Sequence, residues 1–403
     1  MYISKLFIDG FRSLKAATIQ DMRPVTVFHG LNNSGKSNIL AALEAIFTSK
    51  FQVDMTVVGK NQTSTRKTKQ FYEGKIENFR DNFYFNKIRK INFAVSVILD
   101  DEELKPYGEV LAQIPPTAPD AKKRITLGDN HKKTCNIQGE IVYAGEAIAE
   151  MTTREVDFNG EYPIYTKGTD GKYQYLPTLK METSKSQAFV DRFLSQMSNA
   201  VRLIPANRYL LKEVVPTGRI ADTALTPQNF KQWLFNAYLG RNDFAKFEEI
   251  QKLFNSSPFE FGELGFSHEG NELEIMVKKN DFRLPINRIG SGLQQILYLV
   301  AVIVLHQGKV LAIEEIEINL SPAAQKQVFE LLKKCVTATP RLLNQVFITS
   351  HSDYFDVRDD VKCFSVEYDL GKSCSEVMPW TVAWRKKHFC HDRLIGVADA
   401  GKP

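Results

Sequence analysis

The stretch GLNNSGKSNIL, from Gly30 to Leu40, contains residue types that bind phosphate. It holds a glycine, four further residues and then Gly-Lys-Ser, which is the spacing of a P-loop. Glycines let backbone N–H groups converge on phosphate oxygens, while Lys36 would reach the β- and γ-phosphates and Ser37 would bind Mg²⁺. A turn with a chance lysine is the alternative. The buried-strand pattern of Val25–His29 before the loop and the helical spacing of Ser37–Phe47 after it favour the phosphate site.

Two adjacent acids end a second apolar run. Lys309–Glu315 has the pattern of a buried strand, and its last two residues are Glu314 and Glu315. One carboxylate here could hold Mg²⁺ through water, and the other could orient or polarise an attacking water. The alternative is that one acid simply caps the next turn. Because two like charges leaving a buried strand are costly for stability alone, we interpret the pair as functional.

Two weaker signals accompany the loop and the acids. His351 follows the apolar run Gln345–Thr349 and could sense a γ-phosphate, although a structural histidine is the ordinary reading of such a residue alone. Ser291 and Gly292 precede a long apolar helix predicted over Leu293–Leu305, whose start could bind a phosphate. The four elements together indicate a nucleotide site assembled from distant parts of the chain.

Strands that alternate with helices around these motifs predict a mostly parallel α/β sheet. Ile91–Leu99 and Glu272–Val277 are predicted to be strands, and Pro322–Cys335 is predicted to be an amphipathic helix. Residues 100–185 have short alternating runs that predict a β-rich insertion. Residues 186–256 are predicted to be helical, with a break at Pro205.

Composition limits the class of protein. The chain has 403 residues, 43% of them apolar, and a net charge of +5, which neither demands nor excludes nucleic acid as a partner. Its five cysteines are scattered, as expected of free thiols in a reducing cytosol. The N-terminus does not resemble a signal peptide, and the apolar run Ile296–Leu305 is too short to span a bilayer. We therefore expect a cytoplasmic protein.

In their order and spacing, the motifs resemble ABC-type ATPase heads. They are most similar to the overcoming-lysogenization-defect (OLD)-like ATPases of the AAA_15 and AAA_21 kind and their RecF and SMC relatives. The segments that carry the resemblance are FIDGFRSL, GLNNSGKSN, IPANRYL, GSGLQQ, VLAIEEIEINLSP and ITSHSDYF. The resemblance implies an α/β fold, a RecF/SMC-like P-loop ATPase head with a mixed sheet and flanking helices, split by an α+β insertion.

The resemblance also implies roles for single residues. Glu315 takes the position of the catalytic glutamate, His351 that of the switch histidine, and Lys36 completes the catalytic set. Ser37 and Glu314 take the positions that hold Mg²⁺. The residues implied to bind ATP are Gly30, Asn32, Asn33, Ser34, Gly35, Lys36, Ser37, Asn38, Arg12, Ser291 and Gly292.

Some of these implied contacts involve a neighbouring subunit or have a structural alternative. Ser291 and Gly292 would meet the γ-phosphate held by a neighbouring subunit. For Arg12 the alternative is a surface arginine on a hairpin. The sequence also departs from the usual EEPEIHLHP after the acids, because Ile316, Asn319 and Ser321 replace a proline and two histidines. The departure removes any role carried by those histidines and leaves the Mg²⁺ position intact.

The split head predicts four parts along the chain. Residues 1–50 would form the N-terminal part of the head with the P-loop, and residues 51–200 a basic, aromatic and β-rich inserted lobe. Residues 201–270 would form a helical lobe, and residues 271–403 the C-terminal part of the head with the signature, the Walker B strand and the switch histidine. The roughly 255 residues between Lys36 and Ser291 lack the sustained heptads of a long coiled coil.

The expected function is a slow ATPase that uses ATP and Mg²⁺ as a homodimer, or a larger oligomer, with ATP sandwiched at the interface. Few residues follow His351, so we expect no Toprim nuclease of its own. Stand-alone OLD-like ATPases occur in anti-phage systems such as PARIS and Septu and in retron-associated modules. There the ATPase controls a separate effector, often a nuclease, and DNA or a phage protein is a candidate ligand.

Two alternatives stay open. The first is a RecF-like DNA-repair or recombination ATPase, which the clustered Lys, Arg, Phe and Tyr residues of segment 50–90 would favour. The other explanation of this segment is a solvated lobe that binds no nucleic acid, in which the aromatic residues form its core and the charged residues its surface. The second alternative is a nucleotide-dependent scaffold that does not turn ATP over. A transporter motor is disfavoured because the sequence has no membrane segment.

Overall fold

The computed structural model describes most of both ends of the chain and shorter stretches between them. The described residues are 1–48, 56–59, 62–65, 90–99, 134–143, 149–158, 162–167, 173–174, 197, 200–206, 208, 225–240, 243–256, 259–269, 272–352, 355 and 361–384. The chain divides into two compact units: the first unit comprises Met1–Arg202 and Val357–Pro403, and the second unit comprises Leu203–Asp356.

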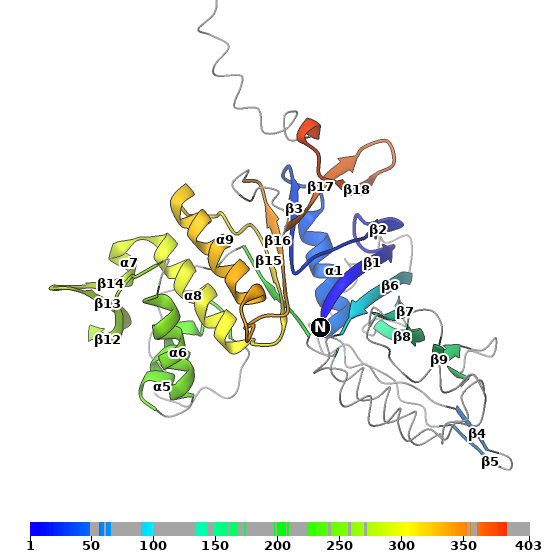
Figure 1. The fold of residues 1–403 in the computed structure, drawn as a ribbon, viewed down its shortest axis with the longest axis horizontal. Helices are drawn as coiled ribbons and strands as arrows, with labels where there is room; N and C mark the ends of the chain where they lie inside the picture. The colour runs from blue at the N-terminus through cyan, green and yellow to red at the C-terminus, as the bar shows by residue number, and fades with distance from the viewer. Residues whose placement is uncertain are drawn as a thin grey trace, which may run out of the picture. The chain divides into compact units, whose positions relative to one another are not determined.

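Three neighbouring strands of a mixed sheet, β3, β17 and β18, belong to the first unit. Strand β3 (Val25–Gly30) is buried along its whole length and pairs in parallel with β17 (Val361–Asp369), in a register that joins Gly30 to Val366. Strand β17 pairs antiparallel with β18 (Cys374–Pro379). Helix α1 (Lys36–Thr48) follows β3 directly after the glycine-rich loop (Figure 1). This strand–loop–helix arrangement confirms the two elements predicted on either side of the loop.

A second sheet in the first unit is antiparallel and joins distant segments. Its order is β10–β9–β8–β7–β6–β1–β2. Strand β6 alternates between buried and half-buried residues, as expected of a strand with one face on a core. The strands of the predicted insertion thus continue the sheet that begins with the N-terminal strands. The bounds are β1 Tyr2–Asp9, β2 Ala17–Ile19, β6 Lys90–Ile98, β7 Thr134–Tyr143, β8 Ala149–Phe158, β9 Tyr162–Lys167 and β10 Tyr173–Gln174.

The second unit is built on a pair of parallel strands. Strands β15 (Val310–Ile313) and β16 (Gln345–Ser350) are buried at every residue, which is typical of a sheet covered on both faces. Helix α9 (Pro322–Thr337) packs against β16, and α8 (Ser291–Leu305) lies beside α9 (Figure 1). Helix α8 is apolar on nearly all sides because it lies in the core of this unit.

Further elements surround α8. Helix α6 (Phe244–Phe254) packs against α8, and α5 (Phe230–Tyr238) packs against α6. Strands β12 (Glu263–Glu269), β13 (Glu272–Lys279) and β14 (Phe282–Pro285) form a separate antiparallel sheet. The short helix α7 (Ile286–Ile289) leads from that sheet into α8. The start of α8 is therefore fixed by elements on both of its sides.

The predicted elements around the motifs are confirmed: β6, β13, α8, β15, α9 and β16 all occur where their patterns indicate. One prediction needs correction near Pro205, where the helix prediction fails because β11 (Val201–Ile204) is a strand that ends just before the proline. Most of segment 50–90 lies outside the described residues, apart from the hairpin β4–β5 (Thr56–Gly59 and Gln62–Thr65) and Lys90. Within the described part of the chain, no helix has the length and apolarity to cross a membrane.

Cysteine chemistry gives a first test of this packing. Cys335, Cys363 and Cys374 are buried, and none of these three forms a disulfide. Burial raises the pKa of the Cys335 thiol to about 12, so almost none of it is thiolate at pH 8. We expect Cys335 to resist iodoacetamide in the native protein and to react once guanidinium unfolds the chain, as read by peptide mass spectrometry. Equal labelling of Cys335 in both conditions would contradict its burial in α9.

Candidate functional site

The predicted site residues fall in both compact units. In the first unit the glycine-rich loop is tightly packed. Gly35 has φ 101°, and a Cβ there would lie 2.0 Å from Ser375 Oγ. A Cβ on Gly30 would lie 2.4 Å from the carbonyl oxygen of Val366 on β17. Glycine is therefore required at both positions by the neighbouring backbone and side chains, in addition to any ligand.

The ammonium group of Lys36 is buried above this loop. Lys36 is 5% exposed, and its Nζ donates to the carbonyl oxygens of Gly30 and Leu31, each at 2.9 Å. Ser34 is also buried, and its Oγ has no hydrogen-bond partner among the described residues. The first N–H groups of α1 lack intrahelical acceptors, as at every helix start. Lys36, Ser34 and these amides offer donors of the kind that bind a phosphate.

A network of side chains ties Arg12 to the first turn of α1. The Arg12 guanidinium donates to Asn38 Oδ1 at 3.3 Å, and Asn38 Nδ2 donates to Ser13 Oγ at 2.7 Å. The Ser13 and Ser375 hydroxyls are 2.6 Å apart and share a hydrogen bond. Arg12 thus lies beside the loop, and the network links β18 to the helix that carries Ser37 and Asn38. Ser37 is half-buried, whereas Asn32 and Asn33 are exposed.

In the second unit, Glu315 and His351 come together. They follow the neighbouring parallel strands β15 and β16, whose carboxyl ends lie at the same edge. His351 Nε2 is 3.4 Å from Glu315 Oε1, and the Glu315 N–H donates to Thr349 Oγ1 at 3.0 Å. Glu315 has φ 42°, a left-handed conformation that is uncommon outside glycine. The carboxylate predicted to be catalytic is therefore held against the predicted switch histidine.

Glu314 has different partners from its neighbour. Its N–H donates to the carbonyl oxygen of Ile204 at 2.9 Å, and its Oε2 accepts from the Ala206 N–H at 3.4 Å. The two acids of the pair are thus separated, one beside the segment after β11 and the other beside the loop after β16. This separation suits two roles, because each carboxylate is free of the other's hydrogen bonds.

Arg208 also belongs to this region, and sequence reasoning missed it. It is 2% exposed, and its guanidinium donates to the carbonyl oxygens of Pro205, Glu314 and Glu315 at 2.9, 2.7 and 3.0 Å. Burial lowers the pKa of Arg208 to about 10, against the opposing effect of nearby Glu317 and the acid pair. The IPANRYL segment carries part of the family resemblance, but no pattern in it indicates that its arginine reaches the acids.

The residues that depart from the usual family sequence have structural roles here. Asn319 has φ 58°, which asparagine tolerates well. Ser321 caps α9, since its side chain accepts from the Ala324 N–H, and Pro322 occupies the first helical position. Glu317 accepts a hydrogen bond from the backbone N–H of His351. The loop between β15 and α9 is thereby fixed at both ends.

The signature residues lie at the start of α8. Ser291 is exposed. Gly292 faces its own chain, because a Cβ there would lie 2.7 Å from the carbonyl oxygen of Asn319. The glycine thus allows close packing of α8 on the loop after the acids. That packing is a second reason for a glycine at this position, beside the predicted phosphate contact.

The fold and these groups define the class of the protein. It is an α/β protein in which a glycine-rich loop joins a buried strand to a helix, with paired acids at the end of another buried strand. Residues 1–355 match the family AAA ATPase domain (AAA_15). The chain belongs to this family, which confirms the ATPase class predicted from the motifs.

Several other proteins are similar to this chain, either over a short segment or over most of the chain at low sequence identity. The DNA replication and repair protein RecF of Caldanaerobacter subterraneus subsp. tengcongensis is 30% identical over 119 residues, which cover 28% of this chain and 30% of that one. Uncharacterized protein MJ1542 of Methanocaldococcus jannaschii is 29% identical over 116 residues, 28% of this chain and 14% of that one. The chain therefore spans less than a third of the length of either relative. An ATP/GTP phosphatase of Helicobacter pylori is 19% identical over 373 residues, 89% of this chain and 88% of that one.

Solved structures with a similar chain path include SMC heads. A SmcHead bound to the C-winged helix domain of ScpA is 14% identical, with a TM-score of 0.49 over 96% of this chain and 100% of that chain. The SMC head domain from Thermotoga maritima is 13% identical, with a TM-score of 0.46 over 95% of this chain and 100% of that chain.

The packing of Gly292 gives a direct test of the second unit. We expect Gly292→Ala to lower the free energy of unfolding by about 1–3 kcal/mol, because the new methyl group would press on the Asn319 carbonyl. Gly265→Ala is the matched control, since a Cβ at Gly265 would meet nothing within 4 Å. Urea unfolding of both variants measures the difference. Equal stability of the two variants would refute the close contact.

Proposed function

We propose that this chain binds ATP at the loop Gly30–Ser37 and hydrolyses it with Glu315 as the residue that orients water. The observation that carries the proposal is the contact of Glu315 with His351, at 3.4 Å, in a chain of the ATPase-domain family. A carboxylate held by a histidine, at the open end of a buried parallel strand, is suited to accept a proton from water. The positively charged ammonium group of Lys36 would lie beside the β- and γ-phosphates and stabilise their negative charge.

Mg²⁺ is the metal that this chemistry implies, and the available side chains fit it. Ser37 and Glu314 supply a hydroxyl and a carboxylate, which are the hard oxygen ligands that Mg²⁺ prefers. Within the described residues, no three acids, histidines or cysteines gather as a metal cage. That suits an ion which binds through one or two protein groups, water and substrate oxygens. When bound, Mg²⁺ would neutralise charge on the phosphates.

The remaining predicted residues would act around the phosphates. Ser34 Oγ, buried and unpaired among the described residues, is a donor for a phosphate oxygen, and Arg12 and Asn38 lie beside the first turn of α1. Asn32, Asn33, Gly30 and Gly35 would shape the loop backbone. Ser291, exposed at the start of α8, would contact ATP held by a second copy of the chain, as in an ATP-sandwich homodimer. His351 would stabilise the charge that forms near Glu315.

At the level of the cell, we propose that the ATPase is the sensor or assembly subunit of a bacterial anti-phage defence system. Its motifs resemble those of stand-alone OLD-like ATPases, which act with a separate effector, often a nuclease. Purification from the native operon with ATP and Mg²⁺ tests this role. A large assembly with a second polypeptide would support it. A lone monomer or a bare ATP-dependent dimer would instead favour the RecF-like DNA-repair alternative.

The first prediction from this proposal concerns Lys36. We expect Lys36→Ala to weaken ATP binding about 10- to 100-fold, because a charge-assisted contact is worth about 1.5–3 kcal/mol. Isothermal titration with a non-hydrolysable ATP analogue measures the affinity. Lys279→Ala is the control, since Lys279 Nζ also donates to a backbone carbonyl, that of Glu260, but lies exposed on β13. Equal affinity of the Lys36 and Lys279 variants would refute the site.

The second prediction concerns Glu315. We expect Glu315→Gln to lower kcat for ATP by about 10²- to 10⁴-fold while ATP still binds, because the amide cannot accept the proton of water. Phosphate release measures turnover, and titration measures binding. Glu274→Gln removes a half-buried carboxylate that accepts from Asn287 Nδ2, and it should leave turnover unchanged. Wild-type turnover by the Glu315 variant would show that another residue orients the water.

A further inference from the structure

Arg208 contacts the backbone of both acids at once. Its Nη1 donates to the carbonyl oxygen of Glu314 at 2.7 Å, and its Nη2 donates to that of Glu315 at 3.0 Å. Nη1 also donates to the carbonyl oxygen of Pro205 at 2.9 Å. A guanidinium is a planar fork whose donors can hold two neighbouring acceptors in a fixed relation. The two consecutive peptide planes after Glu314 and Glu315 are thus clamped by one side chain.

These contacts of Arg208 with the carbonyl oxygens of Glu314 and Glu315, here called the clamp, hold a backbone conformation that is unfavourable by itself. Glu315 has φ 42°, a conformation that non-glycine residues adopt only when their surroundings impose it. Its N–H is held by Thr349 Oγ1 and its carbonyl by Arg208. Because φ of Glu315 sets the direction of its Cβ, these two bonds fix the direction in which its side chain leaves the backbone. In this conformation the carboxylate meets His351.

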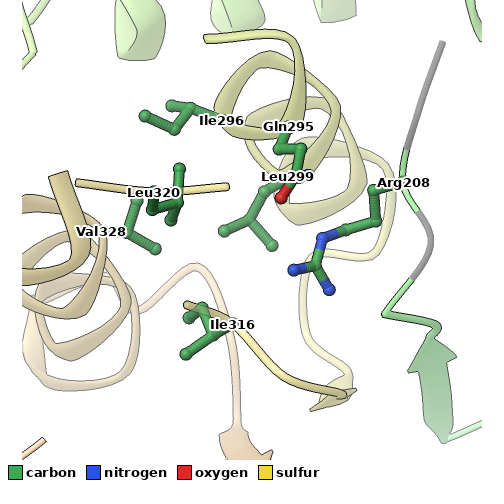
Figure 2. Close-up of a pocket in the computed structure, with 7 residues that line it drawn as sticks. All are labelled: Arg208, Gln295, Ile296, Leu299, Ile316, Leu320 and Val328. Atoms are coloured by element: carbon green, nitrogen blue, oxygen red, sulfur yellow. The ribbon is translucent and has the colours of Figure 1, made fainter. Parts of the chain in front are cut away.

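The surroundings of Arg208 strengthen the clamp. Figure 2 shows the guanidinium beside a small pocket whose other walls are mostly aliphatic and come from α8, α9 and the loop after the acids. Hydrogen bonds are stronger in such a poorly hydrated place than in water. A buried charge is costly unless it is hydrogen-bonded, and the guanidinium has three carbonyl acceptors here. The lining residues are Gln295, Ile296, Leu299, Ile316, Leu320 and Val328.

Gln295 places a polar group in the same pocket. It comes from the second turn of α8, is 2% exposed, and neither atom of its amide has a hydrogen-bond partner among the described residues. Its amide lies on the side of the pocket that faces Arg208 (Figure 2). Ile316 and Leu320, which line the pocket too, belong to the loop that follows Glu315. The start of α8 and the acid-bearing loop therefore line the same pocket as the buried arginine.

We propose that Arg208 is a positioning residue for ATP hydrolysis, which holds the backbone of Glu314 and Glu315 so that the Glu315 carboxylate stays directed at His351. The inference rests on the proposed function of Glu315. Arg208 itself touches no reacting atom. Its effect on turnover passes through the two carbonyl oxygens that it binds.

The test replaces the guanidinium group of Arg208 with an ammonium group, which keeps the positive charge but cannot hold two acceptors side by side. Arg208→Lys should lower kcat about 10- to 100-fold, because an ammonium cannot hold two neighbouring carbonyls as a guanidinium does, and should change ATP affinity less than about threefold. Arg283→Lys is the matched control, since Arg283 also donates to one backbone carbonyl, that of Phe266, but is exposed on β14. A kcat equal to that of the control, per folded molecule by circular dichroism, would overturn the proposal.

A double variant separates positioning from loss of structure. In the Glu315→Gln background, Arg208→Lys should cause little further loss of turnover, because the residue that it positions is already disabled. A general structural defect would instead multiply the two losses. Full multiplication would therefore overturn the proposal. If Arg208→Lys does not fold, Arg208→Gln, which removes the buried charge together with the fork, is read in the same way.

Hydrogen exchange reads the clamp without any reaction. In Arg208→Lys, amides between Glu314 and Leu320 should exchange faster than in the wild type, while those of β13 should not change. If the wild type fails to hydrolyse ATP, the proposed function fails, and this measurement still decides the role of Arg208 in the loop. Unchanged exchange from Glu314 to Leu320 would overturn the clamp.

Discussion

Two adjacent carboxylates leave a buried strand, and the second unit is organised around keeping them apart. Like charges at such a place repel each other and lose hydration, so each needs partners of its own. The Glu314 carboxylate accepts a hydrogen bond from the Ala206 N–H. The Glu315 carboxylate contacts His351, and the Glu315 backbone has an uncommon left-handed conformation. The parallel pairing of β15 with β16 supplies Thr349 and His351 at the same edge. The arrangement that is costly for folding is the one that hydrolysis of a phosphoanhydride would use.

The first unit depends on a different constraint: β17 and β18 lie very close to the glycine-rich loop. Gly30 and Gly35 have no room for a side chain, and the Ser13–Ser375 contact braces the loop from β18. Lys36 is buried with its charge satisfied by two loop carbonyls, so the loop has a defined shape before any phosphate arrives. A loop that is already ordered loses little conformational freedom when a ligand binds, which is a source of affinity.

The sequence indicates the elements near the motifs because their patterns are local. An apolar run before Gly30, the helical spacing after Lys36 and the run before Glu314 each determine one element and its ends. Arg208 escapes such reasoning because two of its partners are backbone carbonyls more than a hundred residues away, and a carbonyl leaves no trace in a sequence. The second role of Gly292 depends likewise on the Asn319 carbonyl. Ser321 could have been found, since a serine followed by proline is a helix-start signal.

We propose above all that the glycine-rich loop and the acid pair serve the same ATP molecule. A crystal structure of the Glu315→Gln variant with ATP and Mg²⁺ tests this most directly, because that variant should trap the substrate. We expect the triphosphate in the loop Gly30–Ser37, with Mg²⁺ on Ser37 and the substituted side chain at position 315 in reach of the γ-phosphate. A nucleotide bound elsewhere, or one in the loop with the residues after β15 remote from its phosphates, would contradict this.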